Sequence, residues 1–273
     1  FVPEHGKIGT DPGMDVGDEV WYYSDNSADY SNKTTFWIAK GMQNSNEPLV
    51  DYWNGTQWGK AMFVGIRDCN VFIENIDKVP DLSAYDKETW KAEAKVLKAF
   101  YHFWMMRMYG PIPIIKENIP VSAGEDEVRV VRDKIDDIVT YIVSLIDESV
   151  EYLPLNIQNE AAEMGRITRP AAKAIKAKIL AFAASPFFNG NLDYANFKNA
   201  EGEPFFNQVY DNEKWTKAAD ACLEAIQCAE EAGHGLYEFV NMSSTQLSDE
   251  TILSLSNRCK VTERWNKELV WGC

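Results

Sequence analysis

The segment from Trp90 to Ile115 constrains the fold of this chain more than any other. Its apolar side chains recur at steps of three and four, which places them on one stripe of a helix: Trp90, Ala94, Leu97, Tyr101, Trp104 and Met108. A polar stripe runs beside it, formed by Lys91, Lys95, Lys98 and His102. From Phe100 onward the apolar residues surround the helix, which predicts burial on most sides. We expect Gly110 to cap this helix, and Pro111 and Pro113 prevent its continuation.

Four further segments have the spacing of amphipathic helices, at about 58–76, 133–152, 168–186 and 213–232. The apolar stripes are Met62, Ile66, Cys69, Ile73 and Ile76 in the first, Ile135, Ile138, Ile142, Leu145 and Leu153 in the second, and Trp215, Ala219, Cys222, Ile226 and Ala229 in the last. Thr168 is a good N-cap residue, and Pro170 is tolerated in the first turn. The alanines that follow would let a neighbouring helix approach closely.

This pattern predicts a mainly all-α protein, because no convincing strand alternation separates the helices. Adjacent helices should pack as antiparallel hairpins, similar to tetratricopeptide pairs but without their strict repeat period. We expect one domain over residues 1–273. It would comprise an aromatic, loop-rich segment at 1–57, helical pairs at 58–232 and an irregular tail at 233–273 with a strand-like run at Val270 and Trp271. The long loop from Phe187 to Asn212 is of a length that is often functional.

Charge and composition exclude several classes of partner. The chain has 42 acidic and 27 basic residues and a net charge of −15, which disfavours nucleic acid and anionic lipid. No apolar run is long enough to cross a bilayer.

The five cysteines lack CxxC spacing and are expected to be buried free thiols, and the three histidines lack ligand spacing. We therefore predict no metal site. Phe1 does not begin a signal peptide, so we expect a processed segment upstream.

The common enzyme motifs are absent. The chain has no phosphate-binding GxxxxGK[ST], no GxGxxG opening a helix, no HExxH and no GxSxG. Adjacent carboxylates occur at Asp136–Asp137 and Glu230–Glu231, but neighbours on one helix point in different directions, whereas a glycosidase needs two carboxyl groups facing each other. We predict solvated surface for these acids, and no catalytic residue or cofactor is proposed.

The aromatic segment before residue 58 is the best candidate for a binding surface. A sugar ring has a face of C–H groups that an indole or phenol covers, and an edge of hydroxyls that polar side chains bond. Candidate ligand residues combine both chemistries: Trp21, Tyr22, Tyr23, Asp25, Asn26, Trp37, Trp53 and Asn54. The alternative is that these aromatics fold inward and cover the helical core.

The amino-acid sequence at 90–115 resembles the central signature of the SusD/RagB family. The matching residues are Glu93-Ala94, Ala99-Phe100-Tyr101, Arg107, Tyr109-Gly110 and Pro113, while Lys98 stands where the family often has arginine. Further blocks match in order, namely Trp58, Gly65-Ile66 and Asn70, then 136–154, Gly165-Arg166-Ile167-Thr168, Ala171-Ala172 and Ala177-Lys178, then Trp215, Ala218-Ala219, Ala225-Ile226 and Glu268-Leu269-Val270. The resemblance covers roughly Trp58 to Trp271.

The resemblance implies a non-enzymatic lipoprotein on the outer surface of a Bacteroidetes-type bacterium, anchored through an N-terminal cysteine absent from this chain. It implies tetratricopeptide-like helix pairs, a SusC-like TonB-dependent transporter as partner, and glycans as ligands. Members are usually longer, which implies that this chain is an N-terminal portion. The matching blocks are scaffold residues, so the ligand surface is expected in loops before Trp58 and after Phe187. Alternatives are a peptide ligand as in RagB-like members, a protein-interaction scaffold, and a glycosidase.

Overall fold

A computed structural model describes residues 37–56, 61–242, 244 and 246–272. The chain divides into two compact units, Phe1–Asp68 and Cys69–Cys273. The prediction of a single domain stays a prediction. The named elements of the described residues are helices: α3 Met62–Asn75, η1 Ile76–Lys78, α4 Ala84–Tyr109, α5 Glu125–Val128, α6 Ile135–Asp147, η2 Val150–Tyr152, α7 Glu160–Glu163, α8 Arg169–Ala184, α9 Glu213–Glu231 and α10 Asp249–Cys259.

Helix α4 contains most of the segment that dominates the sequence. It starts at Ala84, earlier than the predicted pattern, because the Ser83 hydroxyl accepts a hydrogen bond from the Asp86 N–H at 3.1 Å. The helix ends as predicted at Gly110, which takes a φ of 69° and donates its N–H to Met106 O at 2.9 Å. A left-handed φ favours glycine, and the prolines that follow lead the chain away in an extended segment.

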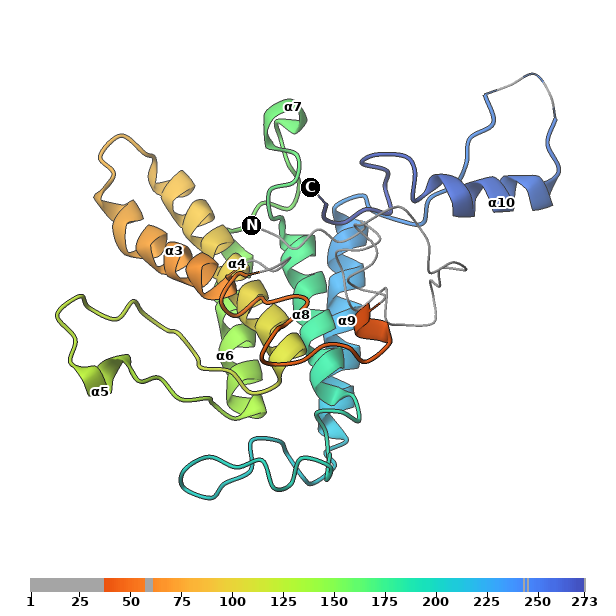
Figure 1. Cartoon of the computed structure of the whole chain (residues 1–273). Helices are drawn as coiled ribbons and strands as arrows, with labels where there is room; N and C mark the ends of the chain where they lie inside the picture. The colour runs from red at the N-terminus through yellow and green to blue at the C-terminus, as the bar shows by residue number, and fades with distance from the viewer. Residues whose placement is uncertain (1–36, 57–60, 243, 245, 273) are drawn as a thin grey trace. The chain divides into compact units, whose positions relative to one another are not determined.

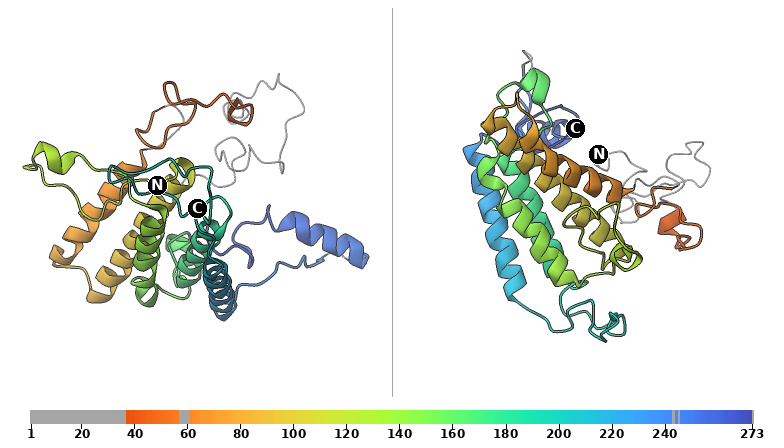
Figure 2. Two further views of the ribbon diagram at one scale, coloured as in Figure 1. Left: turned by 90° about the horizontal axis from the view of Figure 1, so that it is seen from below. Right: turned by 90° about the vertical axis from the view of Figure 1, so that its left-hand side faces the viewer.

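Helices α4, α6, α8 and α9 lie side by side and alternate in direction (Figures 1 and 2). Each packs against the next, α4 on α6, α6 on α8 and α8 on α9. The predicted stripe of α6 is buried at Ile135, Ile138, Ile142 and Leu145. The described residues form no named strand, and isolated bridges join Asn189 to Asn207 and Lys198 to Pro204. The mainly helical fold of antiparallel pairs is therefore confirmed.

The prediction for the buried face of α9 was wrong. Its buried residues are the small ones, Ala218, Ala221, Ala225 and Cys228. The large side chains of the predicted stripe face outward, and Trp215 and Ile226 are 42% and 55% exposed. Ala221 and Ala225 pack with Ala177 of α8, so small residues on both helices allow the close approach. The close approach of α8 and α9, and not the hydrophobicity of the side chains, thus determines which residues of α9 are buried.

Two residues of the predicted polar stripe of α4 are buried and do not face solvent. Lys98 and His102 are buried, at 4% and 0% exposure. The segment after Gly110 folds back over them. His102 Nδ1 lies 2.8 Å from Lys98 O, and its Nε2 accepts the Ile115 N–H at 3.2 Å. This pairing defines a neutral imidazole with its proton on Nδ1. Burial, reinforced by the charge of Lys98, lowers the pKa of His102 to about 4.

The loop between α8 and α9 is closed at its base by an asparagine. Asn189 Nδ2 donates to Asp211 O at 2.8 Å, and its Oδ1 accepts the Asp211 N–H at 2.8 Å. Gly190 has a φ of 78°, and a Cβ there would lie 2.9 Å from Tyr210 N. Only glycine meets both requirements without displacement of the backbone. The long loop is therefore held in a defined conformation at its base.

The four described cysteines differ in burial, whereas the sequence predicts that all are buried. Cys69 and Cys228 are buried, whereas Cys222 is exposed on the outer face of α9. The tail contains α10, which Ser248 caps by accepting the Thr251 N–H, and which packs against no other described helix. Val270 and Trp271 form a bend and not the expected strand-like run.

Candidate functional site

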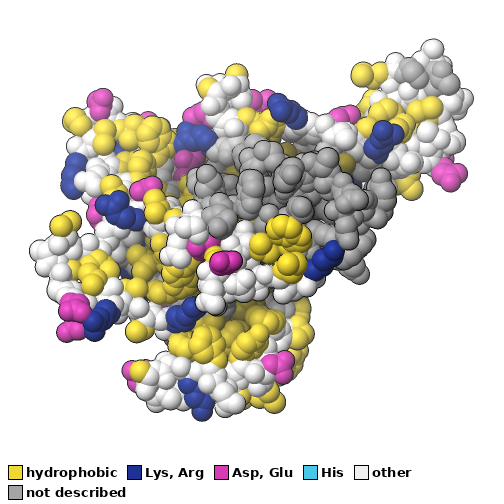
Figure 3. Space-filling view, in the orientation of Figure 1, with side chains coloured by type: hydrophobic (Ala, Val, Ile, Leu, Met, Phe, Trp, Pro, Cys, Tyr) yellow, Lys and Arg dark blue, Asp and Glu magenta, His cyan; other side chains and the backbone are white. Residues whose placement is uncertain are grey.

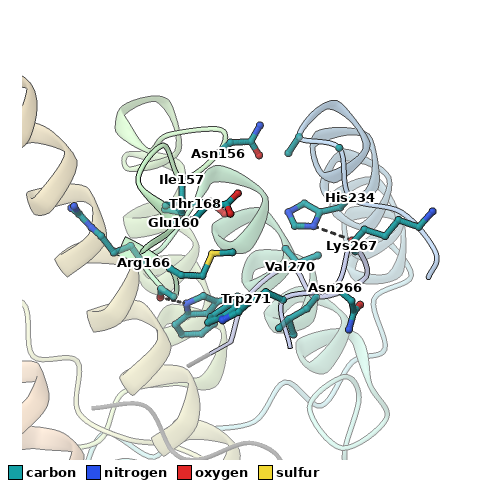
Figure 4. A pocket seen from close by; sticks show the side chains of 16 residues that line it. Asn156, Ile157, Glu160, Arg166, Thr168, His234, Asn266, Lys267, Val270 and Trp271 are labelled. Carbon is teal, nitrogen blue, oxygen red and sulfur yellow. Dashed lines mark hydrogen bonds between the residues drawn. The ribbon is translucent and has the colours of Figure 1, made fainter. Parts of the chain in front are cut away.

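A cavity of about 440 Å³ lies in the second unit, beside the helix array. Its walls come from the segment around α7, the start of α8, the C-terminal end of α9 and the tail after Gly233 (Figure 4). Polar side chains line it at Asn156, Glu160, His234 and Lys267, and apolar ones at Ile157, Met164, Leu269 and Val270. Two tryptophans, Trp265 and Trp271, complete the lining. The volume is in the range of sites for small ligands.

Trp271 is anchored at both ends of its indole ring. Its Nε1 donates to Gly165 O at 3.0 Å, and its ring meets Phe100 of α4 edge to face, with centroids 5.7 Å apart. Phe100 belongs to the core of α4 and is 4% exposed. Gly165 has a φ of 98°, and a Cβ on it would lie 3.1 Å from Gly272 O. The tail therefore reaches the scaffold at a point that requires glycine.

Trp265 has an unusual backbone conformation. Among the described residues it is the non-glycine residue with a positive φ, 53°. A bulky residue in this region is uncommon and costs roughly 1–3 kcal/mol, which the surrounding structure must offset. Its side chain is 39% exposed and lies near Gly165, where the Cη2 atom would be 3.6 Å from an added Cβ. The indole thus stands at the cavity with part of its surface open to a ligand.

Hydrogen bonds of the tail hold the turn that carries Trp265. Asn266 Nδ2 donates to Lys260 O at 2.9 Å and to Glu263 O at 2.8 Å, and its Oδ1 accepts the Glu268 N–H at 3.0 Å. His234 Nδ1 lies 3.1 Å from Lys267 O (Figure 4). Since a carbonyl oxygen only accepts, Nδ1 carries the proton, and Nε2 of a neutral imidazole remains an acceptor.

Arg166 fastens the other wall of the cavity to α4. Its Nε and Nη2 donate to the two carboxylate oxygens of Glu93, both at 3.0 Å, and Nη1 donates to Glu163 at 2.5 Å. The guanidinium also lies over the Trp90 ring, 5.5 Å from its centroid. The Glu93 hydrogen bond, more than any other contact, raises the pKa of Arg166. The Gly165-Arg166 block that resembles the family therefore positions this wall.

The arrangement suits a ligand with one apolar face and several polar edges. An indole offers a flat surface for C–H groups, while His234, Glu160 and Lys267 offer both donors and acceptors. Among the described residues, no three His, Cys, Asp or Glu side chains are grouped so that they could hold a metal ion. No described helix is long and apolar enough to span a membrane.

Five of the eight predicted ligand residues, Trp21, Tyr22, Tyr23, Asp25 and Asn26, lie outside the described residues. The remaining three, Trp37, Trp53 and Asn54, belong to the first unit, whereas the cavity is built by the second unit alone. Trp37 is half-buried in a short helical turn. Their role as ligand residues stays a prediction.

Trp53 and Asn54 come together around Asp51. The backbone N–H groups of both residues donate to Asp51 Oδ1 at 2.9 Å. Asn54 Nδ2 and Thr56 Oγ1 donate to Oδ2 at 3.1 Å and 2.7 Å. Burial acts to raise the pKa of Asp51, but these hydrogen bonds together hold the pKa below its ordinary value. The Trp53 ring meets Phe63 edge to face at 5.0 Å, so it is partly engaged in packing.

The loop between α8 and α9 carries a cluster of aromatic side chains, visible as a hydrophobic surface at the lower edge of the molecule (Figure 3). Tyr194 stacks on Phe206 with centroids 4.9 Å apart, and Phe206 stacks on Phe188 at 5.9 Å. Phe188 and Phe206 are buried, whereas Phe187 and Tyr194 are 47% and 41% exposed. The cluster is a second surface on which a flat ligand can stack.

The array of antiparallel helix pairs is the scaffold of a known protein family. Residues 10–180 match the model of the SusD-like family described as "Starch-binding associating with outer membrane", and the chain belongs to that family. A SusD-like protein of Bacteroides ovatus is 31% identical over 99 residues, which are 36% of this chain and 16% of that protein.

Solved structures have the same fold. BT4246 is 29% identical with a TM-score of 0.70, and the match covers 88% of this chain and 43% of BT4246. A laminarin-binding SusD-like protein is 18% identical with a TM-score of 0.54, and the match covers 90% of this chain and 42% of that protein. The chain thus spans less than half the length of these relatives.

Sequence reasoning did not identify this cavity. The loop that it named, from Phe187 to Asn212, contributes no residue to the lining, and the tail with both tryptophans was predicted only as irregular. It assigned the block from Gly165 to Thr168 to the scaffold, although this block also lines the cavity. The sequence feature that could have indicated the cavity was the presence of two tryptophans, Trp265 and Trp271, in a short polar tail. The hydrogen bond from Trp271 to Gly165 joins residues 106 positions apart, which no local pattern reveals.

Proposed function

We propose that this protein is a non-catalytic glycan-binding protein of the outer-membrane surface. It captures oligosaccharides in the cavity of Trp265 and Trp271 and passes them to a SusC-like TonB-dependent transporter, with a lipid anchor holding it at the surface. Membership of a starch-binding, outer-membrane family supports this proposal. The names of two structural relatives mention laminarin and a xylogluco-oligosaccharide.

The observation that carries the proposal is the pair of indoles at the cavity. Trp265 is held at a positive φ and stays 39% exposed, while Trp271 is fixed to Gly165 and Phe100. Rigid aromatic side chains stack on sugars at low entropic cost, and the polar groups around them bond hydroxyls. Because the platform is partly open to solvent, we expect modest affinity for each sugar unit.

Titration calorimetry of the chain with starch, laminarin and xyloglucan oligosaccharides tests the proposal. Trp265→Ala should weaken binding by about 10-fold to 100-fold, the loss expected when a stacked aromatic surface is removed. Trp215→Ala is the matched control, since Trp215 is 42% exposed on α9, away from the cavity lining. Equal affinity of both variants would exclude this cavity, and hydrolysis of the oligosaccharides would contradict a non-catalytic role.

A peptide ligand is the second candidate, and a groove favours it. A depression of about 520 Å³ runs along α6, α8 and the start of α9, with Val139, Val143 and Leu180 as apolar lining. Charged groups border it at Asp136, Asp147, Asp211, Lys214 and Lys217. Helical-pair proteins bind extended segments in such grooves. Binding of a peptide library that Val143→Asp abolishes and Trp265→Ala leaves intact would favour this candidate.

A further inference from the structure

Another cavity in the second unit, of about 490 Å³, collects lysines in a protein of strongly negative charge. It lies between the end of α3, the middle of α4, α6 and the segment after Gly110. Lys95, Lys98 and Lys116 line it together with Tyr141, and we call it the lysine cavity. Two exposed acids, Glu74 and Glu117, also line it.

Two of the three ammonium groups converge on one aromatic ring. Lys98 Nζ lies 5.7 Å from the centroid of the Tyr141 ring, and Lys116 Nζ lies 6.0 Å from it. Lys98 Nζ donates to Lys116 O at 2.6 Å. Lys95 is neutralised by Glu148 at 2.8 Å. Within the described part of the chain, neither Lys98 nor Lys116 forms a salt bridge with a carboxylate.

The positive charge of Lys98 is only partly compensated by its neighbours. A buried ammonium loses hydration, and one carbonyl and one ring face compensate only part of the loss. Lys98 is 4% exposed, and burial lowers its pKa. The charge of Lys95 also lowers the pKa of Lys98, whereas the exposed acids Glu117 and Glu74 act in the opposite direction. An oxyanion bound at Lys98 and Lys116 would compensate the ammonium charge directly.

The volume and the lining of the cavity suit an anionic group that belongs to a larger molecule. Its volume lies in the range of cavities that hold small organic ligands, well above the space of one inorganic ion. Tyr141 is held edge to face against His102, with centroids 5.5 Å apart, so its ring is fixed in place next to both lysines. The aromatic ring and the Asn70 amide suit the remainder of a sugar.

We infer that the lysine cavity is a subsite for the oxyanion of an acidic sugar, either the carboxylate of a uronate or a sulfate ester, held by Lys98 and Lys116 over the Tyr141 ring. This inference rests on the proposed glycan-binding function and narrows its substrates to glycans with acidic units. It requires no contribution from the tryptophan-lined cavity.

Titration of the chain at constant ionic strength with glucuronate, glucose 6-sulfate and glucose tests the inference. Glucuronate or the sulfate ester should bind at least 10-fold more tightly than glucose. Binding of glucuronate alone would identify a uronate as the source of the anion, and binding of the sulfate ester alone would identify a sulfated sugar. Equal affinity for all three ligands would overturn the inference.

Three variants assign the binding to this cavity. Lys98→Met keeps an unbranched side chain as far as Cε, removes the ammonium group, and should weaken oxyanion binding by about 10-fold to 100-fold. Lys116→Ala changes an exposed side chain, keeps the backbone carbonyl that Lys98 bonds, and should also weaken it. Glu74→Gln removes a repelling charge and should strengthen it by about 2-fold to 3-fold. Lys176→Ala is the control, since that lysine pairs with Asp147 outside the cavity.

The outcomes separate this inference from the proposed function. If Lys116→Ala and Glu74→Gln leave the oxyanion affinity unchanged, the lysine cavity is not the oxyanion site. This conclusion holds even if neutral oligosaccharides still bind in a Trp265-dependent manner. Absence of binding to every neutral oligosaccharide, with uronate binding that depends on Lys116, would instead reject the tryptophan-lined cavity and retain the oxyanion subsite.

Discussion

Arg166 and Glu93, 73 residues apart in the sequence, form a salt bridge with two parallel hydrogen bonds of 3.0 Å. The pair joins the segment before α8 to the middle of α4, and both side chains are largely buried, at 29% and 17% exposure. The same segment carries Gly165, whose carbonyl accepts the Trp271 indole N–H. One ion pair thus positions both the scaffold and one wall of the candidate site.

Glu93→Gln should lower the free energy of unfolding by about 1–2 kcal/mol, because it leaves a partly buried guanidinium with weaker hydrogen bonds. Urea unfolding followed by circular dichroism measures this. Glu125→Gln is the control, since its salt bridge with Arg129 is exposed at 77% and 68%, and it should change stability by less than about 0.5 kcal/mol. Equal effects of the two substitutions would show that Arg166 gains nothing from its buried partner.

Stability should fall as the pH falls from neutral toward the folded pKa of His102. In the unfolded chain His102 has the ordinary histidine pKa of 6.5, whereas in the folded protein its pKa is about 4. Between these values the unfolded state binds more protons, so acidification favours unfolding, by up to about 3 kcal/mol. Below pH 4 this contribution no longer changes.

Denaturant titrations at pH 7.0, 5.5 and 4.5 measure this effect. His102→Gln provides an uncharged side chain that can accept from Ile115 and donate to Lys98, and its stability should depend less on pH than that of the wild type. Carboxylates titrate in both proteins, so the difference between them isolates the histidine. Identical slopes would contradict a neutral buried His102.

Ala225→Leu should destabilise the protein by about 1–3 kcal/mol, because the added atoms overpack the interface of α8 and α9. Ala219→Leu on the exposed face of the same helix should change stability by less than about 0.5 kcal/mol. Thermal unfolding of the two variants compares the faces directly. The opposite order would support the face that hydrophobic periodicity alone predicts.

Gly190→Ala should destabilise the base of the α8–α9 loop by more than Gly202→Ala. Both glycines have a positive φ, 78° and 84°, so both substitutions cost about 1–2 kcal/mol from backbone strain. A Cβ at Gly190 would also meet the backbone of Tyr210 at 2.9 Å, whereas nothing lies within 4 Å at Gly202. Chemical denaturation resolves the difference, and equal losses would mean that the loop adjusts without cost.

Local signals in the sequence predicted the helices well. The end of α4 follows from Gly110 and the prolines after it, and the start of α8 follows from Thr168 and Pro170. These features act within one turn of the chain, so a local sequence pattern is enough to reveal them. The periodicity of Ile135, Ile138 and Ile142 likewise predicted the buried side of α6.

The errors concern contacts between distant residues. Hydrophobicity assigned Trp215 and Ile226 to the core of α9, but close packing against Ala177 selected Ala221 and Ala225. Lys98 and His102 lie beside the apolar stripe of α4 and resemble a solvated face. They are buried because the segment near Ile115 and Lys116 folds over them and supplies hydrogen-bonding partners.

The sequence by itself determined the mainly helical class, the end of α4 and the start of α8, because capping groups and apolar periodicity act over a few residues. Its ordered motif blocks determined the family. Tertiary structure alone decided which face of α9 is buried, which lysines converge on Tyr141, and that Trp271 reaches Gly165. These outcomes depend on the separation of helices and on hydrogen bonds between residues far apart in the chain, and no local spacing specifies either.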